Sequence, residues 1–272
     1  MNLPAALLGA IADQNGGRVV LVIGAGCSFE PPTNLPLARA CAEEAHRKLL
    51  LDGVIGPSEC ANPSDLSSVA DAVKAAHSGQ KPLVDRLPVG DFRSAEPNEG
   101  HRLAAALMRE SAIRAVVTLN FDLAISAALA NLGSKEVTIL NGPQDHHLLA
   151  ATNLVYLHRN AYAAAEDWIL STDALENAWQ GQWEECIAAA MLSAPVTVFV
   201  GLGSPAAVLL ESTRKIRAAI PDGVDAFQVD PGDVQDSEFF RALGLPEENY
   251  IRGGWVNFMR ELSARLTAEH VE

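Results

Sequence analysis

The sequence predicts an α/β fold in which helices cover both faces of a parallel sheet. Short β-branched apolar runs alternate with Ala- and Leu-rich segments of helical spacing, and this alternation is typical of βαβ units. The first run, Val19–Ile23, is apolar throughout, as expected of a strand that is buried on both faces. Right-handed crossovers then bring the carboxyl ends of the strands to one edge of the sheet, where such folds bind ligands.

The periodicity indicates where the elements lie along the chain. Strands are expected at Val19–Ile23, Ala115–Leu119, Glu136–Leu140, Leu154–Leu157, Val196–Gly201 and Ala226–Val229. Helices are expected at Leu37–Leu51, His101–Ser111, Leu123–Leu132, Thr172–Leu192, Ala206–Ile220 and Gly254–Thr267. The last of these has the pattern of an amphipathic closing helix.

Residues 53–100 interrupt the alternation between the first two strands and are rich in proline. One helix is expected within them, at Pro63–Ser78, with Asp65 or Ser64 as its N-cap. We therefore expect one domain, residues 1–272, with a helical insertion or lid at about 53–100. The alternative is a long surface excursion without a role.

Composition limits the class of protein. With 272 residues and 49% hydrophobic content, the chain can bury a large core. Its formal net charge of −14 disfavours direct binding of nucleic acid. No apolar run approaches the ~20 residues that span a bilayer, and residues 1–10 lack the pattern of a signal peptide. We expect a soluble, cytoplasmic protein without membrane contact.

The 4 cysteines are widely spaced and form no C-x-x-C pair. A zinc site or a disulfide framework is therefore not expected. Cys27 lies within a glycine turn, but no motif supplies an activating base, so we interpret it as a small filler rather than a nucleophile.

The glycine turn follows the first strand and reads Gly24-Ala25-Gly26-Cys27-Ser28. Glycines at such a turn let a ligand phosphate approach backbone N–H groups. The turn matches the G-x-G-x-x-G fingerprint only in part, because Phe29 occupies the third glycine position. A Rossmann-like nucleotide loop and an ordinary tight strand-to-helix turn are both compatible with this pattern.

Polar residues also follow the second strand, at Asn120 and Asp122. An amide and a carboxylate two residues apart can both point into a cleft, where they can hold a water or a ribose hydroxyl. The alternatives are that Asp122 caps the helix at Leu123–Leu132 and that Asn120 is a turn residue.

The fourth strand ends at His158, which is followed by Arg159. A neutral imidazole at this edge can accept a proton near pH 7, although a buried, hydrogen-bonded histidine is the common alternative. The other histidines are interpreted as surface or packing residues. Among them, His146 and His147 lie beside Asp145 without the spacing of a metal site.

The fifth and sixth strands end in further candidates. Gly201-Leu202-Gly203-Ser204 precedes Pro205, so phosphate could meet a helix N-terminus there, or Ser204 could simply cap that helix. Asp230 could bind a ribose hydroxyl, or it could form a turn before Pro231-Gly232.

Taken in order, these pieces resemble the sirtuin superfamily, and most closely its bacterial NAD-hydrolysing branch. The resemblance is carried by Gly24–Ser28, Asn34–Pro36, Gly100–Arg102, Val117–Asp122, Tyr156–His158 and Phe199–Ser204. It spans roughly residues 18 to 230.

The resemblance implies that NAD is bound across the strand ends as a substrate. Gly24, Ala25, Gly26 and Ser28 would line the diphosphate, and Gly203 and Ser204 would hold the adenosine half, beside Gly201 and Asp230 at the same edge. Asn120 would position water or ribose, Asp122 would lie near the nicotinamide, and His158 would be the catalytic base.

Three departures from the family refine this expectation. The zinc ribbon is missing, since residues 159–195 contain only Cys186, so neither zinc nor protein deacylation is expected. The family's Gly-Ile-Pro-Asp-Phe-Arg does not follow the glycine turn, and Asp91-Phe92-Arg93 spells its end far too late in the chain. The usual His-Gly reads His158-Arg159.

The resemblance thus implies an NAD glycohydrolase (NADase) that releases nicotinamide and ADP-ribose in antiphage defence. It further implies a homo-oligomer that is controlled by a separate regulatory protein. The alternative is an inactive NAD- or nucleotide-binding module that acts as a scaffold. A Rossmann-type oxidoreductase is less well supported, because the chain offers no evident substrate domain.

Overall fold

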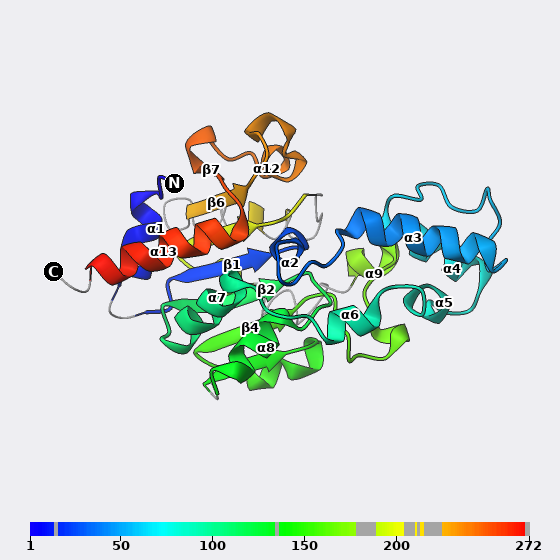
Figure 1. Cartoon of the computed structure of the whole chain (residues 1–272), viewed down its shortest axis with the longest axis horizontal. Coiled ribbons are helices and arrows are strands. Elements are labelled where there is room, and N and C mark those ends of the chain that lie inside the picture. Colours follow the sequence, from blue (N-terminus) through cyan, green and yellow to red (C-terminus); the bar gives the residue numbers. More distant parts are fainter. Residues whose placement is uncertain are drawn as a thin grey trace.

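A seven-stranded, all-parallel sheet forms the centre of the protein, in the order β3-β4-β2-β1-β5-β6-β7 (Figure 1). The computed structural model describes residues 1–13, 16–133, 136–177, 189–203, 210, 213–214 and 225–269. The strands are β1 Val19–Ile23, β2 Ile113–Thr118, β3 Val137–Leu140, β4 Thr152–Tyr156, β5 Val196–Val200, β6 Asp225–Asp230 and β7 Tyr250–Arg252. The α/β, Rossmann-like fold predicted from the alternating pattern is confirmed.

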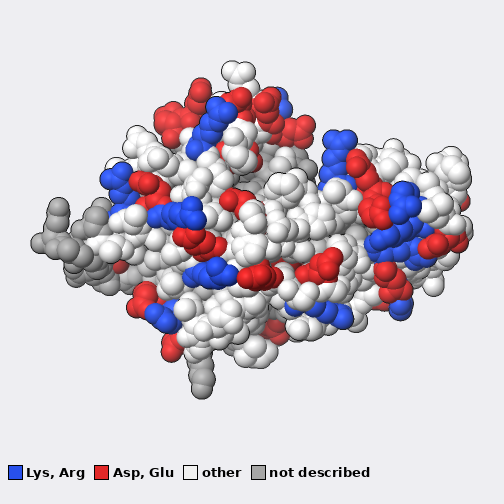
Figure 2. All heavy atoms as spheres, viewed as in Figure 1, with Lys and Arg blue, Asp and Glu red and all other residues white. Residues whose placement is uncertain are grey.

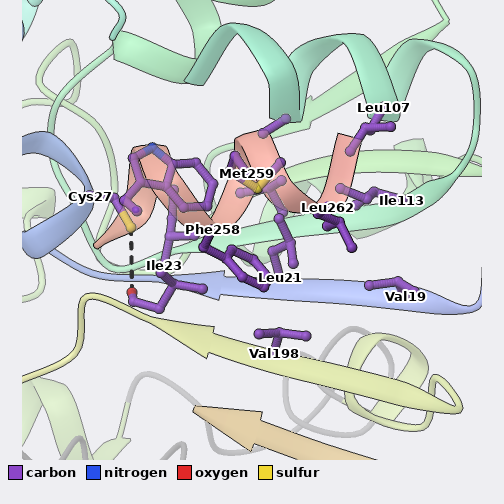
Figure 3. Packing of buried hydrophobic residues seen from close by; sticks show 14 of the residues in the cluster. Val19, Leu21, Ile23, Cys27, Leu107, Ile113, Val198, Phe258, Met259 and Leu262 are labelled. Atoms are coloured by element: carbon purple, nitrogen blue, oxygen red, sulfur yellow. Dashed lines mark hydrogen bonds between the residues drawn. The ribbon is translucent and has the colours of Figure 1, made fainter. Parts of the chain in front are cut away.

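Strand β1 lies at the middle of the sheet and is buried on both faces. Val19, Leu21 and Ile23 pack into one core with helices α1, α7 and α13, whereas Val20 and Val22 pack into the core on the opposite face. Figure 3 shows the first core, in which side chains of α13 lie against β1 and β5. Since successive residues of a strand point to opposite faces, two cores require an unbroken apolar run.

The described helices are α1 Ala5–Ile11, α2 Gly26–Phe29, α3 Ala38–Leu51, α4 Leu66–Ala76, α5 Lys81–Val84, α6 Val89–Arg93, α7 Glu99–Arg109, α8 Ala124–Asn131, α9 Thr172–Asn177, α10 Ala189–Leu192, α12 Glu238–Leu243 and α13 Trp255–Glu269. Helices α3, α7, α8 and α13 match the expected ranges to within a few residues. The expected helix at Thr172–Leu192 contains α9 and α10, and its middle lies outside the described residues. The expected helix at Ala206–Ile220 lies almost wholly outside them.

The seventh strand, β7, was not expected from the sequence. It pairs with β6 through Gln228↔Tyr250, Val229↔Ile251 and Asp230↔Arg252. With three residues and one β-branched side chain, it lacks the apolar run that marks the other strands. This segment is extended because it pairs with β6 at the edge of the sheet, and not because its own residues have a high β propensity.

Helices α3 to α6 lie between β1 and β2 and pack around a separate core, to which Ala124 of α8 and Ala161, Trp168 and Leu170 also contribute. Figure 1 shows α3, α4 and α5 gathered at one end of the molecule, away from the sheet. The single helix expected here is α4, and Asp65 caps it by accepting hydrogen bonds from Ser67 N and Ser68 N. The short helices α5 and α6 were not expected, since their prolines at positions 82 and 88 interrupt any longer helical period.

The surface carries mixed charge. Figure 2 shows Lys and Arg interspersed with Asp and Glu over the face in view. Among the described residues, no helix is long and apolar enough to cross a membrane.

The buried His101 is expected to make folding sensitive to acid. It is 1% exposed, its Nδ1 accepts a hydrogen bond from Asn98 N at 3.3 Å, and burial lowers its pKa to about 3. Because the native state disfavours the protonated ring, stability is full above about pH 6.5 and falls as the pH drops toward 3, by up to about 1.4 kcal/mol per pH unit.

Urea unfolding between pH 7 and 5 measures this slope. His101→Gln is the matched variant, because glutamine at this helix position can also accept the hydrogen bond from the capping residue's N–H but does not titrate. The variant is expected to show a shallower fall in unfolding free energy. Equal slopes in the two proteins would contradict the assignment.

Candidate functional site

The glycine turn after β1 lies against the end of β5. Gly24 N donates to Val200 O at 2.9 Å and Gly26 N donates to Gly201 O at 3.1 Å. A Cβ on Gly24 would lie 2.6 Å from Gly201 O, and one on Gly26 would lie 2.8 Å from Gly201 Cα. The two glycines are thus needed for the close approach of two backbone segments, whether or not a phosphate binds beside them.

This crossing marks the topological switch point of the sheet. From β1 the chain proceeds first to β2, β3 and β4 on one side and then to β5, β6 and β7 on the other. Ligands of open α/β sheets bind outside the carboxyl ends of the strands at such a point. The turn therefore lies where a nucleotide site is expected.

Cys27 is fully buried within the turn, and its Sγ donates to Val200 O (Figure 3). Burial raises the pKa of this thiol well above its usual range, so it is not a nucleophile. Asn98, at the start of α7, anchors the same segment by donating from Nδ2 to Cys27 O at 2.8 Å and to Glu30 O at 3.3 Å.

Ser28, Asn120 and Asp122 form a buried, hydrogen-bonded cluster. Ser28 Oγ donates to Asp122 Oδ2 at 2.7 Å, and Asn120 Nδ2 donates to Ser28 Oγ at 3.2 Å and to Gly24 O at 3.1 Å. Each of the three side chains is less than 10% exposed. The structure therefore brings together three residues that the sequence placed at the ends of two adjacent strands.

The geometry of Asp122 includes the helix contact that was the alternative interpretation of this residue, and its role at a ligand site stays a prediction. Its Oδ1 accepts from Ala124 N at 3.0 Å, at the start of α8, so it does help to begin that helix. Its Oδ2 faces Ser28. Burial raises the pKa of the Asp122 carboxyl, and the hydrogen bonds from Ala124 and Ser28 oppose that shift.

His158 follows β4 and lies beside the loop that carries the cluster. Its ring is 6.2 Å from that of Phe121, centroid to centroid, and Phe121 stands between Asn120 and Asp122 in the chain. Burial, with a smaller contribution from Arg159, lowers the pKa of His158 to about 4, although a hydrogen bond with the backbone of Leu119 opposes the shift. The imidazole is therefore neutral at pH 7 and available as a proton acceptor.

Arg159 has a left-handed backbone, with φ of +73°. Glycine adopts this conformation freely, whereas it costs other residues about 1–2 kcal/mol. The side chain is partly buried and lies against the loop after β3, where a Cβ on Gly142 would be 2.7 Å from Arg159 Nη1. Asp167 and Asp145 act electrostatically on its guanidinium, whose pKa is lowered by burial.

The left-handed backbone at position 159 predicts that a glycine variant is more stable than an alanine variant, which is the reverse of the usual order. Ala normally exceeds Gly in stability, but here Arg159→Gly is expected to be more stable than Arg159→Ala by about 1 kcal/mol, because only Gly relieves the left-handed conformation. Chemical denaturation of both variants measures the difference. Equal stability, or a more stable Ala variant, would contradict the backbone assignment.

The remaining candidates lie along the same edge or outside the described chain. Gly201 contacts the glycine turn directly, and a Cβ on Gly203 would meet nothing within 4 Å. Asp230 Oδ1 accepts from Gly232 N at 2.8 Å, which is the turn geometry considered for this residue. Ser204 lies outside the described residues.

Asp91-Phe92-Arg93 lies far from the other site residues in the sequence. In the structure, however, α6, which contains these three residues, lies against the loop that carries Asn120 and Asp122. Leu123 N donates to Phe92 O at 3.0 Å, and the rings of Phe92 and Phe121 are 6.2 Å apart. The insertion loops out and returns here, so distance along the chain was misleading. The motif itself was the signal that could have found these residues.

Among the described residues, no group of three or more His, Cys, Asp or Glu side chains is placed to hold a metal ion. Cys186 is not among those residues, and the expectation of no zinc remains a prediction.

Comparison with known proteins places the fold. No protein-family model and no curated protein sequence matches this sequence. Solved structures that it resembles include a mutant Sir2 homologue with ADP-ribose, with 18% identity, TM-score 0.52, and 99% of this chain and 98% of that chain covered. A Sir2 homologue–NAD complex has 17% identity, TM-score 0.51 and coverage of 98% and 95%. A Sir2 homologue mutant with 2′-O-acetyl ADP-ribose has 17% identity, TM-score 0.54 and coverage of 98% and 98%. These comparisons confirm the sirtuin-like fold.

Proposed function

We propose that this protein is an NAD glycohydrolase, which cleaves the bond between nicotinamide and ribose and releases nicotinamide and ADP-ribose. The observation that carries the proposal is the buried cluster of Ser28, Asn120 and Asp122 at the switch point of the sheet. The solved structures with the same fold include complexes with NAD and ADP-ribose, which supports NAD as the substrate.

Asn120 is the residue best placed to position water. Its Nδ2 donates hydrogen bonds to Gly24 O and Ser28 Oγ, so the amide plane is fixed. Its Oδ1 accepts no hydrogen bond from the described residues and would accept one from a water or a ribose hydroxyl. A fixed acceptor beside the ribose favours attack on the oxocarbenium-like centre that forms as nicotinamide leaves.

Asp122 and His158 would complete the chemistry. The Asp122 carboxyl would lie near the nicotinamide, held in place by Ser28. His158, neutral at pH 7, would accept a proton from the attacking water or from a ribose hydroxyl. Gly24, Ala25 and Gly26 would line the diphosphate, with Gly201, Gly203, Ser204 and Asp230 toward the adenosine half.

Incubation of the purified protein with NAD between pH 4.5 and 8, with mass analysis of the products, tests the proposal. Nicotinamide and ADP-ribose are expected in equal amounts. Because the pKa of His158 is about 4, release should stay nearly constant down to about pH 5, rather than fall near 6.5 as for an ordinary histidine. Absence of nicotinamide, with or without a partner protein, would exclude the hydrolase.

A scaffold that binds NAD without cleaving it is the second candidate. It is favoured by Arg159, a cation directly beside the candidate base. Calorimetry with NAD, run beside the product assay, separates the two: heat of binding without product supports the scaffold.

The resemblance to the NAD-hydrolysing sirtuin-like branch supports a role in antiphage defence. It likewise supports cytoplasmic action as a homo-oligomer under the control of a separate protein. Light scattering of the purified protein tests the oligomer.

A further inference from the structure

The insertion holds residues 161–169 through one buried side chain, that of Gln80. This residue directly precedes α5 and is 1% exposed. Its Nε2 donates to three backbone carbonyls, those of Ala165 at 2.9 Å, Glu166 at 3.3 Å and Trp168 at 2.5 Å. A single amide from the insertion therefore fixes the path of a segment that lies far along the chain.

Backbone groups at the start of α5 add to this contact. The Glu166 carboxylate accepts hydrogen bonds from Gln80 N at 3.0 Å and from Lys81 N at 3.1 Å. Hydrogen bonds to a charged acceptor are roughly twice as strong as neutral ones. Both the side chain and the backbone of Gln80 are thus bonded to residues 161–169, which restricts the conformations of that segment.

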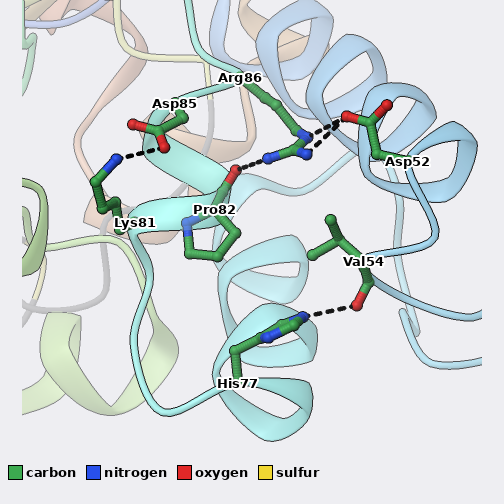
Figure 4. Close-up of polar contacts among 7 residues, drawn as sticks. All are labelled: Asp52, Val54, His77, Lys81, Pro82, Asp85 and Arg86. Carbon is green, nitrogen blue, oxygen red and sulfur yellow. Dashed lines mark hydrogen bonds and ion pairs between the residues drawn. The ribbon is translucent and has the colours of Figure 1, made fainter.

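Helix α5, which begins directly after Gln80, is itself fixed on the neighbouring helices (Figure 4). Arg86, just beyond α5, donates to Asp52 Oδ2 at the end of α3, from Nε at 3.0 Å and from Nη2 at 2.6 Å. At the end of α4, His77 Nε2 donates to Val54 O at 2.9 Å. The helices of the insertion therefore form a frame that presents Gln80 in a defined position.

Residues 161–169 contact both loops of the candidate site through their backbone. Ala161 N donates to Phe121 O at 2.8 Å, in the loop that follows β2. Ile169 N donates to His158 O at 3.3 Å, in the loop that follows β4. A displacement of residues 161–169 would therefore act on both loops at once.

The Trp168 side chain makes a third contact with the site. Its ring is 2% exposed and stacks on Phe121, with 4.3 Å between the centroids and 17° between the planes. Phe121 stands between Asn120 and Asp122 in the chain. The His158 ring lies 6.2 Å from that of Phe121. Because buried side chains are close-packed, Phe121 can move only if Trp168 gives way.

We propose that Gln80 is a positioning residue of the candidate site. It holds residues 161–169 so that Trp168 and the backbone of Ile169 keep Phe121 and His158 in place. The insertion then contributes to the site without touching the substrate. The effect on catalysis rests on the proposed NAD hydrolysis, whereas the effect on the geometry of the two loops does not.

Hydrogen exchange, followed by mass spectrometry of peptide fragments, tests this role without an activity assay. Gln80→Met keeps the length of the side chain but donates no hydrogen bond. Its exchange is expected to be about tenfold faster than that of wild type, as after loss of stabilising hydrogen bonds. The increase is expected both in residues 161–169 and in residues 119–124. A contact with only a local, structural role would speed exchange in residues 161–169 alone.

Asn153→Leu is the matched control for the exchange experiment. It also replaces a fully buried amide by an apolar side chain, since Asn153 lies on β4 and bonds with the backbone of Ala150. This variant is expected to be less stable than wild type. It should nevertheless leave exchange in residues 119–124 unchanged.

Gln80→Glu provides a version of the same change that pH can reverse. An ionised carboxylate would repel the three carbonyl oxygens, whereas a protonated one can donate to one of them. Burial and the neighbouring Glu166 carboxylate raise the pKa of the introduced carboxyl. Exchange in residues 119–124 is therefore expected to be faster than in wild type at pH 8 and to approach the wild-type rate at pH 5.5. If Gln80→Met does not fold, this comparison carries the test.

Nicotinamide release is measured on the same variants. Gln80→Met is expected to lower kcat by up to about 100-fold, the effect of displacing groups at a reacting centre by about 1 Å. KM should change less, because the glycine turn is not altered. In Gln80→Glu, kcat should rise as the pH falls from 8 to 5.5, while that of wild type stays nearly constant.

Three results would overturn the proposal. They are wild-type exchange of residues 119–124 in Gln80→Met, an equal increase there in Asn153→Leu, and an unchanged kcat for Gln80→Met in an active enzyme. If the wild-type protein releases no nicotinamide at all, the proposed hydrolysis fails, and the exchange experiment alone decides whether Gln80 positions the two loops.

Discussion

Asn120→Ala and His158→Ala are each expected to reduce nicotinamide release below detection. Loss of a preorganised polar group at a reacting centre typically lowers the rate by about 10²–10³-fold, and loss of a general base by about 10²–10⁴-fold. In Asn120→Ala, the acceptor for water and the two bonds that fix Gly24 and Ser28 are removed together. Release is measured by mass analysis at fixed NAD concentration.

Asn153→Ala is the matched control for this experiment. Asn153 is fully buried on β4, and its side chain bonds with the backbone of Ala150, so the variant loses a buried amide away from the cluster. It is expected to unfold more easily yet keep its rate of release per folded molecule. Wild-type rates in both Asn120→Ala and His158→Ala would remove the basis for the proposed mechanism.

Gly201→Ala is expected to destabilise the fold by about 3 kcal/mol or more. Gly201 has φ of +67°, and a Cβ there would lie 2.8 Å from Cys27 N and 3.0 Å from Gly26 Cα. The left-handed backbone costs about 1–2 kcal/mol with a side chain, and overlap with backbone atoms that cannot yield adds about 1–3 kcal/mol. Urea denaturation gives the free energy of unfolding.

Gly203→Ala provides the comparison two residues away. A Cβ there meets nothing within 4 Å, so stability should be unchanged or slightly higher, since Ala restricts the unfolded chain. If this variant nevertheless loses affinity for NAD in calorimetry, Gly203 approaches the ligand, as proposed. Similar unfolding free energies for the Gly201 and Gly203 variants would show that the close backbone crossing is wrong.

The central strands and their ends could be predicted because burial on both faces leaves an unmistakable apolar run. Val19–Ile23 is the clearest case, and the polar residues that follow such runs had to meet at one edge. β7 could not be predicted in this way, because three residues at the sheet edge owe their conformation to β6 rather than to their own pattern.

Contacts that depend on the path of the chain between β1 and β2 could also not be predicted from the sequence. Phe92 comes back to the loop of Asn120 because α3 to α6 pack into a core with Ala161, Trp168 and Leu170 and return the chain to the sheet. Gly24 and Gly26 show a second kind of contact that the sequence could not specify. Two glycines in a turn indicate that another group approaches closely, but the sequence does not say that this group is the backbone of Gly201.

The pairing of β1 with β5 has a consequence for biosynthesis. The carbonyls that accept from Gly24 N and Gly26 N come from residues 200 and 201, so these two N–H groups have no native acceptor until most of the chain has left the ribosome. Contacts of such long sequence separation form slowly. During synthesis, the residues of the proposed nucleotide site exist well before they can assemble, so we expect the β1–β5 crossing, and with it that site, to form among the last steps of folding.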